Sequence, residues 1–465
     1  MPRLPKRIHI IGISGRIVSG LALELKRRGC RITGSDSQVF PPSDVWLIKN
    51  GINFFSTYAA RHVPKDADLV IVGPLITSGN VEWRSALRKK IPVIRWPHFI
   101  NRYLMQKPGE NLVVVGTNGK STTSAMLAWI CDQADPAHPV DRLIGGIGRN
   151  EVESVRWRGA KTRVIEGDEF LTGLDDPTPK FLHYQPTLGV VTNIRHDHCE
   201  FYPSAQEYNE LFERFVRLIP LHGTLVLHAD EPLAPKLTAE CPGHTVQVGT
   251  IRKVDYRITA LKEKRHSTEF MLNGVRFALP LFGKFNAKNA ALAAAAAAQQ
   301  GVSLQVSAAA LGTFRGLHMR QEIHCDGAQF TLIEDEAFHP HALNELLGSL
   351  RRRYPKRRLV VVFQPRLTGG REDIFQRELP SALGVGDLIL ALPAWGWNTP
   401  DRPPFDNALL ARQTRRRGVS WRACQNGEEL CKSFARELRE KDVVLLSLGF
   451  RREAIRDQLV RLATH

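Results

Sequence analysis

The stretch LVVVGTNGKSTTSAMLAWICDQ, residues 112–133, decides the fold of the central part of the chain. It begins with an apolar run rich in valine, continues with a turn that holds Gly116 and Gly119, and ends in a helical pattern. A buried strand, a glycine-rich turn and a helix in this order are typical of a phosphate-binding loop. Only two residues separate the glycines, so the loop is shorter than the usual Walker form.

The residue types of this loop suit phosphates. Glycines let backbone N–H groups converge on phosphate oxygens, and the helix N-terminus adds the positive end of its dipole. Lys120 can neutralise the outer phosphates, and a hydroxyl can bind Mg²⁺. The alternative is a structural turn that contains a lysine by accident. The predicted loop consists of Gly116, Thr117, Asn118, Gly119, Lys120, Ser121 and Thr122.

Carboxylates and histidines follow the next two predicted strands. Glu166, Asp168 and Glu169 lie at and just after the end of the strand RVIEGD, and the stretch 193–198 lies at and just after the end of the strand LGVVTNI. Because the carboxyl ends of neighbouring parallel strands meet above one crevice, both groups are expected to face the phosphate loop. Carboxylate oxygens are ligands that suit Mg²⁺. Without the loop, the same residues would be interpreted as solvated turn residues.

A second glycine turn, GISGRIVSG at residues 12–20, also follows a strand and opens a helix. Ser14 stands where a dinucleotide site would have glycine, and Arg16 is bulky, so a turn without nucleotide remains an equal alternative. In the context of the whole chain, the turn fits a nucleotide diphosphate sugar better than NAD. The candidate substrate-binding residues here are Gly12, Ser14, Gly15 and Asp36.

Alternating strand and helix patterns predict an α/β protein of three domains, each built on a mostly parallel sheet. A chain of 465 residues has room for about three domains of ordinary size. We expect a Rossmann-like domain at residues 1–107, a phosphate-loop domain at 108–320 and a Rossmann-like domain at 321–465. Residues 255–281 alternate apolar and polar side chains, which predicts antiparallel strands.

The composition indicates a soluble cytoplasmic protein with a phosphate-bearing partner. The net charge of +17 suits phosphates, but the basic residues are scattered without interleaved aromatics, which does not favour nucleic-acid binding. The seven cysteines form no CxxC pair and are expected to be free thiols. No segment approaches the ~20 apolar residues of a membrane span. We therefore expect no nucleic-acid or membrane partner, and the oligomeric state remains open.

Several motifs follow one another in a fixed order along the chain. They are the GTNGKST loop, the Glu-x-Asp-Glu strand end, Thr192-Asn193-Ile with Asp197-His198, Gly283-Lys-Phe-Asn286-Ala-Lys-Asn289, Arg320 and Asp335. This order resembles that of the Mur ligase family across essentially the whole chain. The resemblance implies that ATP, with Mg²⁺, phosphorylates the lactyl carboxylate of a UDP-sugar, and that an amine then attacks the acyl phosphate to form an amide.

The resemblance also implies roles for individual residues. Lys120 is expected to hold the β- and γ-phosphates, whereas Ser121 and Glu166 are expected to bind Mg²⁺. His198 is expected to lie beside a second metal ion. Together with Arg320, the lysine, the glutamate and the histidine are the catalytic candidates.

Further nucleotide contacts are implied by the same likeness. Asn286 and Asn289 are one turn apart on a predicted helix and are expected to face the nucleotide base together. Arg320 and Asp335 are expected to reach the phosphates and the ribose when the C-terminal domain closes over the site.

Within the family, several stretches resemble the peptidoglycan-recycling branch, which joins L-Ala-γ-D-Glu-meso-diaminopimelate to UDP-N-acetylmuramate. They are SDxxVxPP from residue 35, PKFLHYQP at 179–186 and FQPRLTGGR at 363–371. A ligase that adds L-alanine is the alternative, and a non-catalytic nucleotide-binding regulator is the alternative from another class.

The acceptor end of the chain contains two arginines of interest. Arg366 and Arg371 are candidates for binding substrate carboxylates, because guanidinium groups pair with carboxylates through two hydrogen bonds. Exposed loop arginines are the alternative. Glu336 and Phe338 replace residues that the family pattern would have, so the identity of the peptide acceptor stays open.

Overall fold

The computed structural model divides into two units by its internal contacts. It describes residues 3–37, 39, 43–150, 153–327, 330–367, 372–395, 405–448 and 453–464. The first unit comprises Met1–Ile194, Asn209–Arg257 and Asn289–Leu311. The second comprises Arg195–Tyr208, Ile258–Lys288 and Gly312–His465. Each unit thus combines segments that are distant in the sequence.

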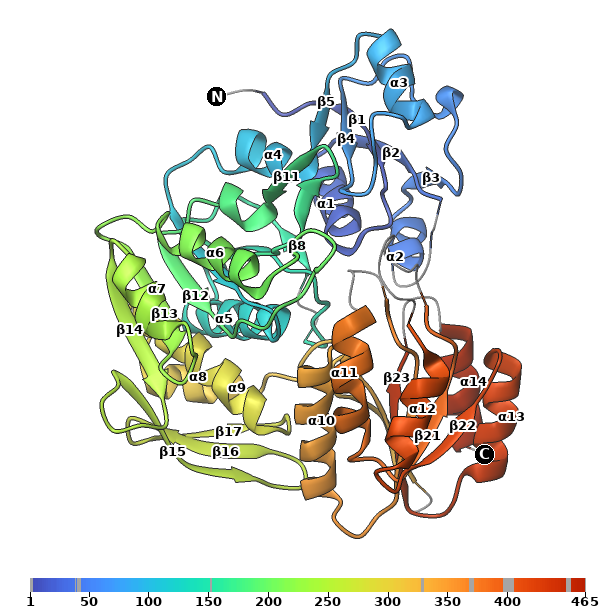
Figure 1. Ribbon diagram of the computed structural model, residues 1–465. Helices are drawn as coiled ribbons and strands as arrows, with labels where there is room; N and C mark the ends of the chain where they lie inside the picture. The colour runs from blue at the N-terminus through green and yellow to red at the C-terminus, as the bar shows by residue number, and fades with distance from the viewer. Residues whose placement is uncertain are drawn as a thin grey trace. The chain divides into compact units, whose positions relative to one another are not determined.

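The first unit begins with a parallel sheet whose strands run in the order β3-β2-β1-β4-β5 (Figure 1). The order reverses at β1, as in doubly wound sheets that bind ligands at the carboxyl ends of their strands. The strands are β1 (Arg7–Ile11), β2 (Arg31–Ser35), β3 (Asn53–Phe55), β4 (Leu69–Val72) and β5 (Val93–Arg95). The helices are α1 (Arg16–Arg27), α2 (Ser43–Lys49), α3 (Val81–Arg88) and the short α4 (Trp96–Phe99).

The central sheet has the strand order β17-β16-β15-β14-β13-β12-β6-β9-β7-β8, and its strands from β14 to β8 lie in the first unit. These strands are β6 (Glu110–Val115), β7 (Asp141–Leu143), β8 (Val155–Arg156), β9 (Thr162–Glu166), β12 (Leu188–Val191), β13 (Thr224–His228) and β14 (His244–Gly249). The helices along this part of the chain are α5 (Lys120–Ala134), α6 (Ala205–Val216), α7 (Ala234–Glu240), α8 (Lys284–Ala298) and α9 (Leu304–Gly312). A separate hairpin, β10 (Leu171–Gly173) and β11 (Asp176–Pro179), leads into the turn η3 (Lys180–His183).

The position of β6 explains why the predicted phosphate site can form. Five of its six residues are buried and the first, Glu110, is partly exposed, as expected for a parallel strand covered on both faces. β6 pairs in parallel with β12 on one side and with β9 on the other. The carboxyl ends of these three strands therefore lie next to one another, as the sequence predicted.

The second unit contains the C-terminal sheet, with the strand order β18-β19-β23-β20-β21-β22 and an antiparallel edge strand, β18. The strands are β18 (Glu322–Asp326), β19 (Phe330–Glu334), β20 (Leu359–Phe363), β21 (Leu388–Ala391), β22 (Ser420–Ala423) and β23 (Asp442–Ser447). The helices are α10 (Pro340–Arg353), α11 (Glu372–Leu383), α12 (Asn407–Arg415), α13 (Gly427–Glu437) and α14 (Glu453–Thr464).

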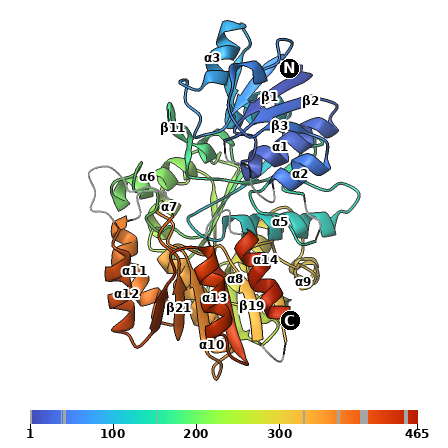
Figure 2. The same cartoon turned by 90° about the vertical axis from the view of Figure 1, so that its right-hand side faces the viewer.

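Successive residues of the C-terminal strands enter two separate cores. Val361 and Leu445 pack in a cluster with α10, α11 and α12, whereas Val360 and Val444 pack in a cluster with α13 and α14. Figure 2 shows these two groups of helices on opposite faces of the sheet. The separation follows from the side-chain period of two in a strand.

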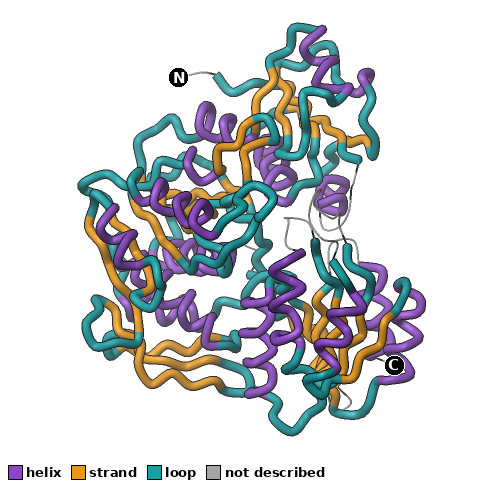
Figure 3. Tube along the Cα trace, viewed as in Figure 1, coloured by secondary structure: helices purple, strands orange, loops and turns teal. Residues whose placement is uncertain are grey.

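The predicted class, three mostly parallel α/β sheets, is confirmed, and Figure 3 shows the sheets accompanied by helices. The antiparallel prediction is also confirmed by β15 (Tyr256–Glu263), β16 (Thr268–Leu272) and β17 (Val275–Leu279). The sequence did not indicate β22, because this edge strand exposes most of its residues and has no apolar run. Within the described ranges, no helix is both long enough and apolar enough to cross a bilayer.

Candidate phosphate-binding site

The predicted loop lies between β6 and α5, and its two glycines are required by the surrounding atoms. Gly119 is the left-handed N-cap of α5, with φ +84°, and a Cβ there would lie 2.7 Å from Oδ1 of Asn289. At Gly116, with φ +132°, a Cβ would overlap the hydroxyl of Thr192. Any other residue would introduce strain at both positions. The backbone can therefore approach a ligand closely here.

Hydrogen bonds from the end of β12 fix the loop conformation. The N–H of Thr117 donates to the carbonyl of Asn193 at 2.7 Å, and the N–H of Asn118 donates to Asn193 Oδ1 at 3.2 Å. In return, Thr192 Oγ1 and Asn193 Nδ2 donate to the carbonyl of Asn118 at 2.7 and 2.8 Å. Thr192 and Asn193 thus position the loop, a role that the sequence did not assign to them.

Lys120 lies at the start of α5 with its ammonium turned back over the loop. Its Nζ donates to the carbonyls of Gly116 and Thr117 at 2.7 and 3.2 Å and forms an ion pair with Glu169 at 2.7 Å. Burial alone would lower the pKa of Lys120, but the carboxylates of Glu169 and Asp168 raise it above its ordinary value. The lysine is therefore held in its charged form beside the loop.

Glu166, at the end of β9, forms the second polar contact of the loop. Its Oε1 accepts from Ser121 Oγ at 2.8 Å, and its Oε2 accepts from the N–H of Gly145 at 2.6 Å. Burial raises the pKa of Glu166, although Lys120 and these hydrogen bonds oppose the effect. Neighbouring ligands of an octahedral Mg²⁺ ion lie about 2.9 Å apart. The Ser121 and Glu166 oxygens therefore fit two positions of a magnesium site.

The other predicted residues of this sheet are placed as follows. Asp168 accepts from Lys180 Nζ at 2.6 Å, and that ammonium also lies 4.7 Å from the ring centre of Phe170. Thr122 lies in the first turn of α5. Asn289 is buried on α8 and lies next to Gly119, the residue at which the loop ends and α5 begins. The structure thus brings the loop, the strand ends and Asn289 together in the first unit.

In the second unit, Asp335 directly follows β19 and binds backbone groups both before β18 and after β19. Its two carboxylate oxygens accept from the N–H groups of Gln321 at 2.9 Å and Ala337 at 2.7 Å. Burial raises the pKa of Asp335 to about 6. Gln321 Oε1 in turn accepts from Nδ2 of the buried Asn286 at 2.9 Å. Gln321 therefore links two predicted site residues, and no motif had indicated it.

Arg320 and His198 also belong to the second unit. Arg320 forms an ion pair with Glu336 at 3.4 Å, so the unexpected glutamate contacts a predicted site residue. His198 has a positive φ of 53°, and its carbonyl accepts from the N–H groups of Phe201 and Tyr202. A sharp turn therefore carries the predicted metal ligand.

The predicted acceptor arginines are only partly described. Arg366 is half-buried, and its guanidinium lies over the ring of Phe338 at 4.9 Å and over that of Trp395 at 5.8 Å. The second departure from the family pattern, Phe338, is thus a packing partner of a candidate residue. Arg371 lies outside the described residues.

The N-terminal glycine turn brings its four candidate residues together. Gly12 has φ +84°, and Gly15 is the N-cap of α1. The N–H and hydroxyl of Ser14 donate to one oxygen of Asp36 at 3.0 and 2.5 Å, and Tyr58 donates to the other at 3.3 Å. Burial, together with the charge of Asp36, raises the pKa of Tyr58 to about 12, so the phenol stays protonated.

Three family models match successive parts of the chain. Residues 7–107 match the Mur ligase family catalytic domain, residues 114–297 match the Mur ligase middle domain, and residues 319–447 match the Mur ligase glutamate ligase domain. Together they cover strands of all three sheets described above.

Curated relatives and a solved structure agree with these matches. The chain is 30% identical to the UDP-N-acetylmuramate–L-alanyl-γ-D-glutamyl-meso-2,6-diaminoheptandioate ligase of Escherichia coli, over 83% of this chain and 84% of that protein. It is also 30% identical to the UDP-N-acetylmuramate–L-alanine ligase of Halorhodospira halophila, over 95% of this chain and 90% of that protein.

The crystal structure of a murein peptide ligase from Psychrobacter arcticus superposes with a TM-score of 0.75 and covers 98% of each chain at 24% identity, a likeness of fold. The three matched regions and the extended identity to named ligases establish that this protein belongs to the Mur ligase family of ATP-dependent amide ligases.

Proposed function

We propose that this ligase joins the tripeptide L-Ala-γ-D-Glu-meso-diaminopimelate to UDP-N-acetylmuramate at the expense of ATP, in peptidoglycan recycling. The observation that carries the proposal is the identity of 30% over 83% of the chain to a ligase named for this reaction. The intact phosphate loop supports it, because an ATP-dependent ligase needs that site. The seven cysteines, all within the described residues, form no disulfide, which agrees with a reducing cytoplasm.

The first unit provides the groups that activate the carboxylate. Lys120 and the backbone N–H groups at the start of α5 hold the β- and γ-phosphates of ATP. Ser121 and Glu166 hold Mg²⁺, which neutralises charge on the phosphates when it is bound. The protein's main contribution is to hold the lactyl carboxylate and the γ-phosphate in line, and the resulting acyl phosphate reacts with the incoming amine.

The remaining candidates bind the substrates and the rest of the nucleotide. Asn286 and Asn289 face the adenine, one turn apart on α8. By their match to the family motifs, Arg320 and Asp335 would contact the phosphates and the ribose, and His198 would help to hold a second metal ion. Their roles follow from the positions they share with the family motifs.

The two ends of the product are bound by the outer sheets. The turn at Gly12, Ser14 and Gly15 receives the UDP-sugar, with Asp36 accepting from its hydroxyl groups and the start of α1 contacting the diphosphate. Arg366 and Arg371 pair with carboxylates of the peptide, which carries several. The loss of either arginine is expected to affect the peptide rather than ATP.

A second candidate function is the addition of L-alanine to the same sugar nucleotide. The observation that favours it is the equal identity of 30% to an L-alanine ligase, over 95% of the chain. The two reactions share the phosphate site and differ in the amine. The identity of the accepted amine, tripeptide or L-alanine, therefore distinguishes the two reactions.

The deciding experiment measures phosphate release from ATP with Mg²⁺ and UDP-N-acetylmuramate, comparing the tripeptide with L-alanine. Release that depends on the tripeptide supports the recycling reaction, whereas release that depends on L-alanine moves the enzyme to de novo synthesis. Mass spectrometry of the product identifies the bond formed. ATP binding without release under either condition would favour a nucleotide-binding regulator and contradict both ligase reactions.

A further inference from the structure

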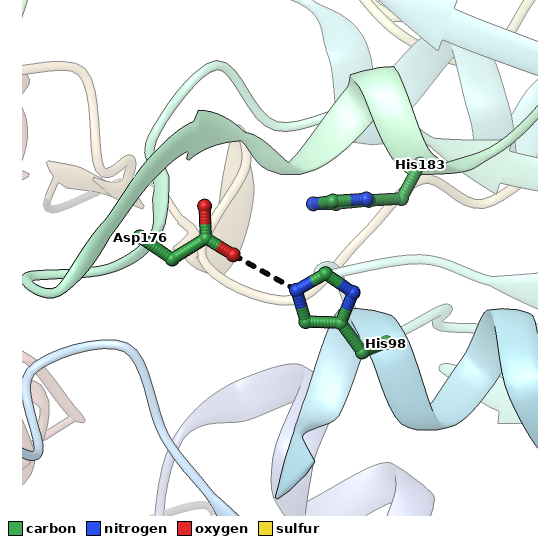
Figure 4. A group of neighbouring side chains, drawn as sticks. All are labelled: His98, Asp176 and His183. Carbon is green, nitrogen blue, oxygen red and sulfur yellow. Dashed lines mark hydrogen bonds and ion pairs between the residues drawn. The ribbon is translucent and has the colours of Figure 1, made fainter.

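Outside the phosphate site, two histidines and an aspartate come together in the first unit (Figure 4). His98 lies on α4, Asp176 begins β11, and His183 ends η3. One nitrogen or oxygen of each side chain lies within 4.8 Å of those of the other two. The three residues come from segments that follow two different sheets, β5 of the first and β9 of the central one.

Hydrogen bonds fix the tautomer of His183. Thr172 Oγ1 donates its single proton to the carbonyl of Thr178 at 2.8 Å, and the same oxygen lies 2.8 Å from Nε2 of His183. Because that hydroxyl has no second proton, it accepts from His183 Nε2–H. Figure 4 shows this Nε2 end of the ring pointing toward Asp176 and His98, so a metal ion held by the three residues would replace the Nε2 proton and its hydrogen bond to Thr172. Burial and the nearby His98 lower the pKa of His183, which favours the neutral form.

Asp176 and His98 are already close enough to share a ligand. Asp176 Oδ2 lies 2.8 Å from His98 Nε2, and its Oδ1 accepts from the N–H of Thr178 at 3.1 Å. Burial alone would raise the pKa of Asp176, but these hydrogen bonds hold it below its ordinary value, so the side chain is a carboxylate. The ring centres of His98 and His183 are 4.5 Å apart in an edge-to-face arrangement, and Figure 4 shows the two rings inclined to each other.

We propose that His98, Asp176 and His183 form a binding site for one divalent transition-metal ion of the zinc class. Two imidazoles and one carboxylate are ligands that zinc accepts, whereas Mg²⁺ and Ca²⁺ prefer oxygen alone. Ligands of a tetrahedral zinc ion are about 3.3 Å apart. The 2.8 Å separation of His98 Nε2 and Asp176 Oδ2 must therefore widen slightly, and the separations within the group that exceed 3.3 Å must contract. The partly exposed His98 side chain permits this adjustment.

A fourth ligand position is left for water on the side of His98, whose side chain is 42% exposed. Binding displaces the His98–Asp176 hydrogen bond, and the proton that His98 Nε2 donates in it passes to Nδ1 or to solvent. The bound ion would connect α4, after the first sheet, to the separate hairpin of β10 and β11, which follows β9.

The test is calorimetric titration of the untagged full-length protein with Zn²⁺, after treatment with EDTA and without nucleotide. We expect one tight site, which is lost in Asp176→Asn and in His183→Ala. Thr172→Val should not weaken binding, because the metal ion replaces the proton that His183 donates to this hydroxyl. His138→Ala is the matched control, because this exposed histidine also contacts an aspartate, Asp135, at 3.0 Å.

Two controls keep the result interpretable. Unfolding of each variant in EDTA shows whether the chain still folds, and Asp176→Asn preserves the size of the side chain. The group Glu322, His324 and Glu334 in the second unit is a rival site, so His324→Ala is titrated in parallel. Absence of a tight site in the wild type, or a site that survives His183→Ala and disappears in His324→Ala, would overturn the proposal.

Discussion

Two turns of this protein share one local pattern and differ in their surroundings. Both follow a buried parallel strand, contain a glycine at φ +84° and lead into a helix, at Gly12 in the first sheet and at Gly119 in the central sheet. The central turn contacts Lys120 and Ser121, which are held by buried carboxylates. The N-terminal turn instead contacts the carboxylate of Asp36.

In both turns the pattern of strand, glycine and helix specifies the backbone shape, whereas side chains from neighbouring strand ends determine which ligand groups each turn favours. Asp36 already accepts the N–H of Ser14, so a phosphate at that N–H would face a like charge. A carboxylate in this place favours the hydroxyl groups of a ligand. Lys120 gives the central turn the opposite preference, for the phosphates themselves.

The largest expected effect comes from removing the cation of the central turn. Lys120→Ala should lower the rate of phosphate release by about 10³-fold or more, since charge stabilisation dominates phosphoryl transfer. Lys236→Ala is the control, because this lysine is 55% exposed and forms an ion pair with Glu213. Steady-state kinetics with saturating UDP-sugar measures the effect. A fall of less than tenfold would show that Lys120 is not the phosphate ligand.

The glycine itself can be tested with a matched pair. Gly119 and Gly29 have the same φ of +84°, but a Cβ at Gly29 meets no atom within 4 Å, whereas one at Gly119 lies 2.7 Å from Asn289. Both alanine variants carry the backbone strain of about 1–2 kcal/mol. Only Gly119→Ala should also abolish ATP binding, measured by calorimetry. Equal ATP affinity in the two variants would remove the special role of this turn.

The parts that the sequence predicted are those decided by local patterns and by parallel topology. The run at residues 112–116 gave the central strand, and the rule for parallel strand ends placed Glu166 and Asn193 beside the loop. These predictions needed no knowledge of packing between distant segments.

The parts that it missed depend on contacts between segments far apart in the chain. Nothing near Gln321 indicates that its side chain bonds Asn286, 35 residues away. Likewise, His98 and His183 are 85 positions apart in the sequence and follow strands of two different sheets, although their rings are in contact. No spacing motif therefore includes both. The prediction of a Mg²⁺ site used a motif, whereas a zinc-class site could only be inferred from coordinates.

A buried glutamate beneath the N-terminal turn offers a smaller test. Glu82 accepts from Ser35 and from the N–H of Ala59, and it contacts His9 and His62 at 3.2 and 3.0 Å. Glu82→Gln should lower the free energy of unfolding by about 1–3 kcal/mol, because a buried acceptor becomes a mismatched donor. Urea denaturation at pH 7 measures it, with the 75% exposed Glu428→Gln as control.

The pH dependence of the stability difference between the wild type and Glu82→Gln gives a further check. Burial alone would raise the pKa of Glu82, but hydrogen bonds from His9 and Ser35 hold it below its ordinary value. The stabilisation by Glu82 is therefore fully present above the unfolded pKa of about 4.3 and is lost as the pH falls through the lower native pKa. A stability difference that grows on acidification would contradict this assignment.

The smallest expected effect separates the two turns directly. Asp36→Asn keeps the size of the side chain and removes its charge, so the KM for the UDP-sugar should rise about tenfold, as hydrogen bonds to charged groups contribute about 1.5–3 kcal/mol. The KM for ATP should not change, because ATP is expected at the other turn. Asp66→Asn, at a 51% exposed surface aspartate, should change neither constant. If both KM values rose together, the two turns would not divide the nucleotides between them.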